Sequence, residues 1–250
     1  MRVFLSEELG IYFKTETADD GLSGLEMAVN SNPDLIICDV KMPGLDGLTV
    51  TSRLKNDFQT SHIPVILLTA LSSESAELAG NECGADAYIM KPFSLKYLIS
   101  RVHNIIEQRE RLRKHFSVEI HDKEHLLSNT NRDKEFYLLV NKILDEHLSD
   151  ANFSVEEFTE LAGQKRTIFY RKVKGLTGYS PNELIKIKRM KKAAGLLLEG
   201  KHTISEVSWK VGIEDPFYFS KCFKAQFGCS PSKYGNNGKV SLIPPEEKFS

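Results

Sequence analysis

The chain has 250 residues and 33 Lys and Arg against 34 Asp and Glu, for a formal net charge of −1. This length is enough for two compact domains, and no apolar run is long enough to span a bilayer, which favours a soluble protein. The four cysteines form no CxxC pair, so we expect free thiols in a reducing cytoplasm.

Charge is distributed unevenly along the chain. Residues 1–110 hold 9 Lys and Arg against 16 Asp and Glu, a balance of −7, whereas residues 131–238 hold 18 against 13, a balance of +5. An acidic half joined to a basic half suggests a nucleic-acid surface in the second half and a separate acidic module in the first.

The first half is predicted to form a parallel sheet covered by helices on both faces. "YFKTETA" (12–18) is expected to be a strand, followed by a helix from about Gly21 to Asn30. Three continuous apolar runs follow, each rich in strand-forming residues, and helix-like segments separate them. The runs are 34–40, 64–70 and 87–93, and the predicted helices are 46–57, 73–83 and 94–113.

Each of the three apolar runs carries a polar residue at its carboxyl end: Asp39, Thr69 and Lys91. Ligands of parallel sheets bind beyond these strand ends, so we expect the three side chains to converge. A carboxylate, a hydroxyl donor and a cation suit a phosphoryl group, because one can accept it and the others can neutralise its oxygens.

The stretches "PDLIICDVKMPGLDG", "IPVILLTA" and "GADAYIMKPF" resemble, in residues and spacing, the receiver domains of response regulators, which have a flavodoxin-like α/β fold. The resemblance implies that Asp39 accepts a phosphoryl group from a histidine kinase while Thr69 and Lys91 stabilise the phosphate. It further implies that Tyr88 is the aromatic switch residue, for which a half-buried structural aromatic is an equal alternative.

The same resemblance implies a cis peptide bond before Pro92, and a Mg²⁺ ion held by Asp39 and the Lys41 carbonyl. A haloacid-dehalogenase type of phosphatase would need an acid two residues after the nucleophile, where this chain has Lys41, so we set it aside.

The opening of the chain, "MRVFLSEELGIYFKTETADDG", aligns with the first helix and second strand of a receiver, so the first strand and its acidic pair are missing. Asp19–Asp20 precedes a predicted helix and is interpreted as a cap rather than as a metal ligand. We expect the chain to be a fragment of a longer polypeptide or to have a misassigned start.

The second half contains an internal repeat after a predicted linker over 114–132 and a helix over 133–148. "SVEEFTELAG" and "TISEVSWKVG", from Ser154 and Thr203, both begin with a capping-box pattern and reach a glycine nine residues later. The segments that follow match at an offset of 50 residues. Two such units in register predict a duplicated helix-turn-helix, joined by a basic helix over 181–199.

This region resembles the AraC-type DNA-binding domain. Its second helices are expected to enter the major groove of double-stranded DNA. The predicted contact residues are Arg166, Thr167, Tyr170, Arg171, Lys174, Phe217, Ser220, Lys221 and Lys224. Asp215 is interpreted as a helix cap rather than as a base contact. Phe169, Trp209, Phe219 and Phe223 are interpreted as core.

The predicted domains are a receiver over 1–113 without its first strand, the linker, an all-α DNA-binding domain over 133–235 and a flexible tail over 236–250. Together they resemble the C-terminal part of a hybrid two-component protein. The hypothesis is a non-enzymatic, cytoplasmic transcription regulator controlled by phosphorylation of Asp39, although a full-length parent could be membrane-anchored. Expected partners are DNA, a histidine kinase domain and a second copy, with RNA polymerase as a further candidate. The rival hypothesis is a degenerate receiver that only dimerises or docks.

Overall fold

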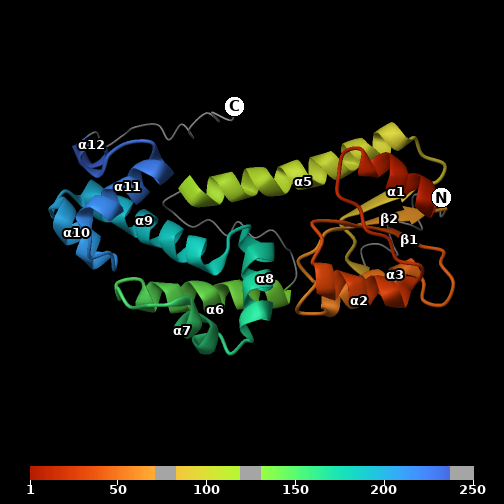
Figure 1. The fold of residues 1–250 in the computed structure, drawn as a ribbon, viewed down its shortest axis with the longest axis horizontal. Coiled ribbons are helices and arrows are strands. Elements are labelled where there is room, and N and C mark those ends of the chain that lie inside the picture. Colours follow the sequence, from red (N-terminus) through yellow and green to blue (C-terminus); the bar gives the residue numbers. More distant parts are fainter. Residues whose placement is uncertain (71–82, 119–130, 237–250) are drawn as a thin grey trace. The chain divides into compact units, whose positions relative to one another are not determined.

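The computed structural model describes residues 1–70, 83–118 and 131–236. The chain divides into two compact units, Met1–Arg109 and Glu110–Ser250, which Figure 1 shows as an α/β part and a helical part. The predicted helix over 73–83 lies outside the described residues except for Cys83, as do most of the predicted linker and nearly all of the predicted tail. No helix in the described ranges combines the length and apolar character needed to cross a membrane.

Unit 1 contains a three-stranded parallel sheet in the order β1-β2-β3, as the continuous apolar runs predicted. The strands are β1 (Ile36–Asp39), β2 (Val65–Thr69) and β3 (Ala87–Met90). The helices are α1 (Arg2–Gly10), α2 (Gly21–Ser31), α3 (Gly47–Asn56) and α5 (Leu95–Val118). Helix α5 extends into the region predicted as linker.

Alternate strand residues fill two separate cores. On one face Ile66 and Ile89 pack against α1 and α5 through Leu9 and Leu98. On the other, Leu67 and Val65 belong to a cluster with residues of α2 and α3. Figure 1 shows the two pairs of helices on opposite sides of the sheet. Burial on both faces explains why these strands are continuously apolar.

The predicted strand over 12–18 is wrong. Among the described residues β1 pairs only with β2, and residues 14–18 have no regular secondary structure and do not join the sheet. Side chains hold this segment instead: the ring of Phe13 lies 4.9 Å from that of His103, and Thr15 donates a hydrogen bond to the Ser6 carbonyl. Strand-forming residues favour an extended backbone, but a strand also needs a hydrogen-bonded neighbour.

Unit 2 is all-helical in its described part and contains the predicted duplication. After α6 (Asn131–His147), the first pair is α7 (Val155–Leu161) and α8 (Arg166–Thr177). The long helix α9 (Pro181–Glu199) leads to the second pair, α10 (Ile204–Lys210) and α11 (Pro216–Phe227), and α12 (Pro231–Asn236) follows. Ser154 caps α7, and Thr203 with Glu206 forms a complete capping box on α10.

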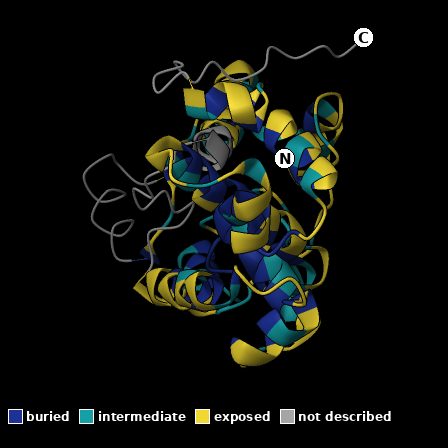
Figure 2. Ribbon diagram, turned by 90° about the vertical axis from the view of Figure 1, so that its left-hand side faces the viewer, coloured by how far each residue is buried: buried dark blue, intermediate teal, exposed yellow. Residues whose placement is uncertain are grey.

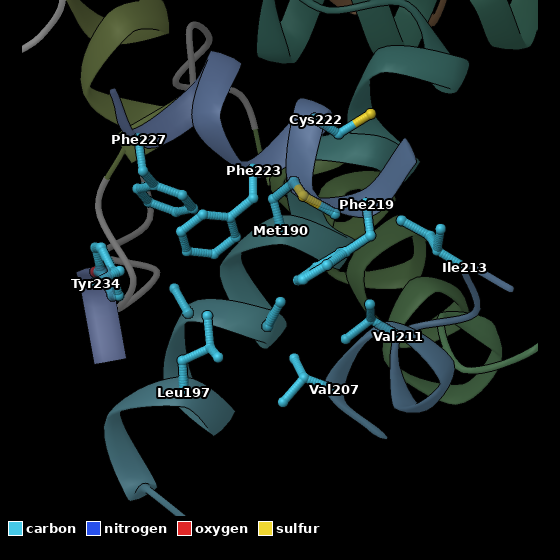
Figure 3. Close-up of a cluster of buried hydrophobic side chains, with 12 residues drawn as sticks. Met190, Leu197, Val207, Val211, Ile213, Phe219, Cys222, Phe223, Phe227 and Tyr234 are labelled. Carbon is cyan, nitrogen blue, oxygen red and sulfur yellow. The ribbon is translucent and has the colours of Figure 1, made fainter. Parts of the chain in front are cut away.

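The turn glycines and the aromatic residues explain how each pair closes. Gly163 and Gly212 both have positive φ, and a Cβ on Gly212 would also lie 2.7 Å from the Leu148 carbonyl oxygen. The rings of Phe158 and Phe169 meet at 4.8 Å in the first pair. In the second pair Phe219, Phe223 and Phe227 point into one cluster with residues of α9, α10 and α12 (Figure 3).

Three of the four aromatic residues predicted as core are fully buried: Phe169, Phe219 and Phe223. The prediction for Trp209 is wrong, because its side chain is 62% exposed and its indole N–H donates to the Glu214 carbonyl at 3.3 Å. Trp209 lies on α10, where Val207 is buried, and Val211, which follows the helix, is buried in the same cluster, as Figure 3 shows.

Candidate functional site

The three polar residues at the strand ends lie at one edge of the sheet. Asp39 pairs in register with Leu68, one residue before Thr69, and Thr69 pairs with Met90, one residue before Lys91. The Lys91 Nζ donates to Asp39 Oδ2 at 2.5 Å, although 52 residues separate the two in the chain. The fold therefore brings together the groups that the sequence placed at separate strand ends.

Both carboxylate oxygens of Asp39 accept hydrogen bonds. Lys91 binds one oxygen, and the backbone N–H of Lys41 donates to the other at 3.1 Å. The side chains of Asp39 and Lys91 remain 25% and 24% exposed. The carboxylate is thus held in place by two donors and is still accessible to a reacting group.

The backbone around Asp39 leaves no space for a side chain at position 47, which is a glycine. The Gly47 N–H donates to the Val40 carbonyl at 2.9 Å, and a Cβ on Gly47 would lie 2.2 Å from the Asp39 carbonyl oxygen. Asp46 caps α3 by accepting from the Thr49 N–H at 2.8 Å. The loop after β1 is consequently pinned to the start of α3, which fixes the position of Asp39.

Lys91 and Thr69 are positioned by the end of the β2–β3 ladder. The Lys91 N–H donates to the Thr69 carbonyl at 2.7 Å, and the cis peptide bond predicted before Pro92 is present. The Thr69 side chain is buried at the strand end. These contacts extend the ladder by one residue, which aims Lys91 toward Asp39.

Tyr88 lies on the same face of the sheet as Thr69, two positions earlier in the β2–β3 register, and is half-buried. Its hydroxyl lies 3.4 Å from the Cys83 thiol, and burial, followed by this contact, raises the pKa of the Tyr88 hydroxyl. Burial also raises the pKa of the Cys38 thiol to about 12. Both groups are therefore neutral near pH 7, and neither is an activated nucleophile.

The described residues do not complete a magnesium site. No group of three or more His, Cys, Asp or Glu side chains in that part of the chain is placed to hold a metal ion. Asp20 caps α2 by accepting from the Ser23 N–H at 2.9 Å, and Asp19 forms an ion pair with Arg2. Mg²⁺ prefers an octahedral set of oxygens, whereas Asp39 and the Lys41 carbonyl supply only two residues, and Lys91 already occupies Asp39 Oδ2.

In unit 2 the predicted DNA-contact residues of α8 lie on its outer face, opposite the buried Phe169 and Val173. Arg166, Thr167 and Lys174 are exposed, and Tyr170 and Arg171 are half-buried. The Arg166 guanidinium forms an ion pair with Glu156 of α7 and lies 5.6 Å from the centre of the Tyr170 ring. Glu156 was not predicted from the sequence, because only the packing of α7 on α8 brings it to Arg166.

The predicted contact residues of α11 also face outward. Phe217, Lys221 and Lys224 are exposed, and Figure 2 shows how such exposed positions alternate with buried ones along the helices. The Ser220 hydroxyl donates to the Pro216 carbonyl at 2.8 Å within the helix. Asp215 accepts from the Phe217 N–H at 2.8 Å, which confirms that it is a helix cap.

A part of each unit matches the model of a known family. Residues 1–103 match the model of the response regulator receiver domain, and residues 159–237 match that of a helix-turn-helix domain. The match over 1–103 covers the Asp39 site, and the match over 159–237 covers α8 and α11.

Several curated proteins are similar to this chain. Histidine kinase P4 of Formosa agariphila is 39% identical over 236 residues, which cover 94% of this chain and 17% of that protein. Response regulator PleD of Caulobacter vibrioides is 44% identical over 94 residues, or 38% of this chain and 21% of that protein. The DNA-binding dual master transcriptional regulator RpaA of Synechocystis is 38% identical over 100 residues, 40% of this chain and 42% of that protein. The chain thus spans less than half the length of each of these relatives.

Proposed function

We propose that this chain, in which a response regulator receiver domain precedes an AraC-type helix-turn-helix domain, is the output end of a two-component system that regulates transcription. This combination of domains is that of a non-enzymatic regulator. The observation that carries the proposal is the ion pair of Lys91 with Asp39 at the strand ends of a chain that also presents two outward-facing basic helices. Such a regulator acts in the compartment that holds the DNA.

Phosphorylation of Asp39 is the control step of the proposal. An Asp39 oxygen attacks the phosphorus of a kinase phosphohistidine, so that a P–O bond forms, the P–N bond breaks and the histidine nitrogen recovers its electron pair. Lys91 then neutralises charge on the acyl phosphate, and the Thr69 hydroxyl binds a phosphate oxygen.

The readout proposed for phosphorylation is a population shift. Moving Thr69 toward a phosphate would alter the packing of Tyr88, which lies on the same face of the sheet. A state in which this face binds a second copy would then be favoured, and two copies would place four DNA-reading helices on paired sites.

The rival function is a receiver that docks or dimerises without phosphoryl transfer. One observation favours it: in the described part of the chain, no group of three or more His, Cys, Asp or Glu side chains is placed to hold Mg²⁺. In that case the ion pair would be a structural link between β1 and β3.

Intact-mass spectrometry after incubation with acetyl phosphate and Mg²⁺, beside Asp39→Asn, separates the two functions. We expect a single phosphoryl adduct on the wild type and none on Asp39→Asn. An adduct on both would place the phosphate elsewhere, and an adduct on neither would leave the docking function. Lys91→Gln serves as a second control, because it keeps Asp39 but removes the cation, and it should reduce the adduct.

A further inference from the structure

The two DNA-reading helices expose different chemistry at equivalent positions. At the offset of 50 residues, Phe217 of α11 corresponds to Thr167 of α8. The Phe217 side chain is 88% exposed at the start of its helix. The equivalent end of α8 presents the Arg166 guanidinium and the Thr167 hydroxyl instead.

The exposure of Phe217 is a consequence of its position on α11. The buried positions of this helix are filled by Phe219, Cys222, Phe223 and Phe227. Figure 3 shows the three phenylalanine rings pointing into the core. Phe217 lies on the opposite face, and its backbone N–H is fixed by Asp215. The side chain is therefore presented outward by a helix that is anchored beneath it.

The surroundings of Phe217 indicate the kind of surface it meets. Lys221 and Lys224 follow at i+4 and i+7, so they continue the same outward stripe, and both are exposed. An apolar ring followed by two ammonium groups fits a polyanion that carries apolar groups between its phosphates. The major groove of DNA is such a surface, because each thymine presents a C5-methyl group there.

We propose that Phe217 makes α11 select A·T pairs by covering a thymine methyl group, whereas α8 reads its half of the site through the hydrogen-bond donors of Arg166 and Thr167. A phenyl ring has no donor or acceptor, and among the four bases only thymine offers a methyl group in the major groove. The inference rests on the proposed function and adds to it the base type that the second helix recognises.

The test begins with selection of binding sites from a random-sequence duplex pool by the full chain. Each thymine of the selected site is then replaced by deoxyuridine, which removes the methyl group and leaves the hydrogen-bonding groups unchanged. Fluorescence anisotropy should show about fourfold weaker binding at one or two thymines, the effect of losing one buried methyl group. Phe217→Ala should bind the thymine and deoxyuridine duplexes equally, and Thr167→Ala should retain the difference.

The outcomes distinguish the inference from the function beneath it. If no sequence is enriched and no duplex is bound, the proposed function fails and the inference with it. If a site is enriched but no replacement of thymine by deoxyuridine weakens binding, the proposed DNA binding stands. The proposed contact of Phe217 with a thymine methyl group is then wrong. The same holds if Phe217→Ala keeps the difference; a Phe217 that serves a protein partner would give this result. Circular dichroism should show that Phe217→Ala folds like the wild type, because removing this exposed side chain leaves no cavity.

Discussion

At the scale of single residues, the guanidinium of Arg166 interacts with neighbouring side chains and is also a candidate DNA contact. It forms an ion pair with Glu156 and lies over the ring of Tyr170, but it is also one of the most prominent donors on the outer face of α8. Both partners of the ion pair are more than half exposed, so the pair itself contributes little to stability, about 0.2–1 kcal/mol. Glu156 therefore competes with an anionic ligand for Arg166.

We predict that Glu156→Gln binds DNA more tightly than the wild type, by about two- to fivefold, because releasing Arg166 no longer requires breaking the ion pair. Anisotropy titrations at low salt measure the gain, which should shrink as salt screens the pair. Glu160→Gln, on the same helix and with the same change of net charge, is the control. An equal gain in Glu160→Gln would mean that net charge alone is responsible.

At the scale of elements, a buried ion pair joins α6 to α8, the second helix of the first repeat unit. Asp133 in the first turn of α6 pairs with Lys172 in the middle of α8, and both side chains are fully buried. The position equivalent to Lys172 in the second unit is the buried Cys222. The repeat therefore tolerates a small, weakly polar side chain at this place, and the charge is specific to the first unit.

We predict that Asp133→Asn lowers the free energy of unfolding of unit 2 by about 3–5 kcal/mol, because it removes the carboxylate charge that pairs with the buried Lys172 ammonium. The double variant Asp133→Leu with Lys172→Met should recover most or all of this loss. Urea unfolding followed by the fluorescence of Trp209, the single tryptophan, reports on unit 2. Equal stability of Asp133→Asn and the wild type would contradict the prediction.

At the scale of the whole molecule, the two halves of the chain differ in charge. Residues 1–110 carry a balance of −7 and residues 131–238 a balance of +5. Lysines near the ends of both reading helices, Lys174 and Lys224, occupy corresponding positions in the two repeats and are exposed. If both helices contact one duplex, each of these lysines should displace a counter-ion from a phosphate.

We predict that Lys174→Ala and Lys224→Ala each reduce the slope of log K against log salt by about 0.9, and that the double variant reduces it by about twice as much. Binding of a duplex at a series of salt concentrations measures these slopes. Lys201→Ala, which removes an exposed charge outside the two reading helices, should leave the slope unchanged. A change confined to one lysine would mean that only one repeat unit touches the duplex.

Much of the fold could be predicted because it depends on neighbours within a few residues. Apolar runs of strand-forming residues located β1, β2 and β3, and capping residues with turn glycines located both helix pairs. Asp39, Thr69 and Lys91 could be placed at one edge because parallel strands share the direction of their carboxyl ends.

Only the tertiary structure decided whether a segment of strand-forming residues joins the sheet and which side of a short helix faces outward. Residues 12–18 do not join the sheet that the described residues form. Trp209 lies outside the core, although its spacing suits a buried position. Glu156, the partner of Arg166, is 10 residues distant in the chain. Asp133, the partner of Lys172, is 39 residues distant. The sequence by itself determined the local elements and their chemistry, because these follow from short-range periodicity. Pairing between distant side chains depends on how the elements pack, so it emerged only from the folded chain.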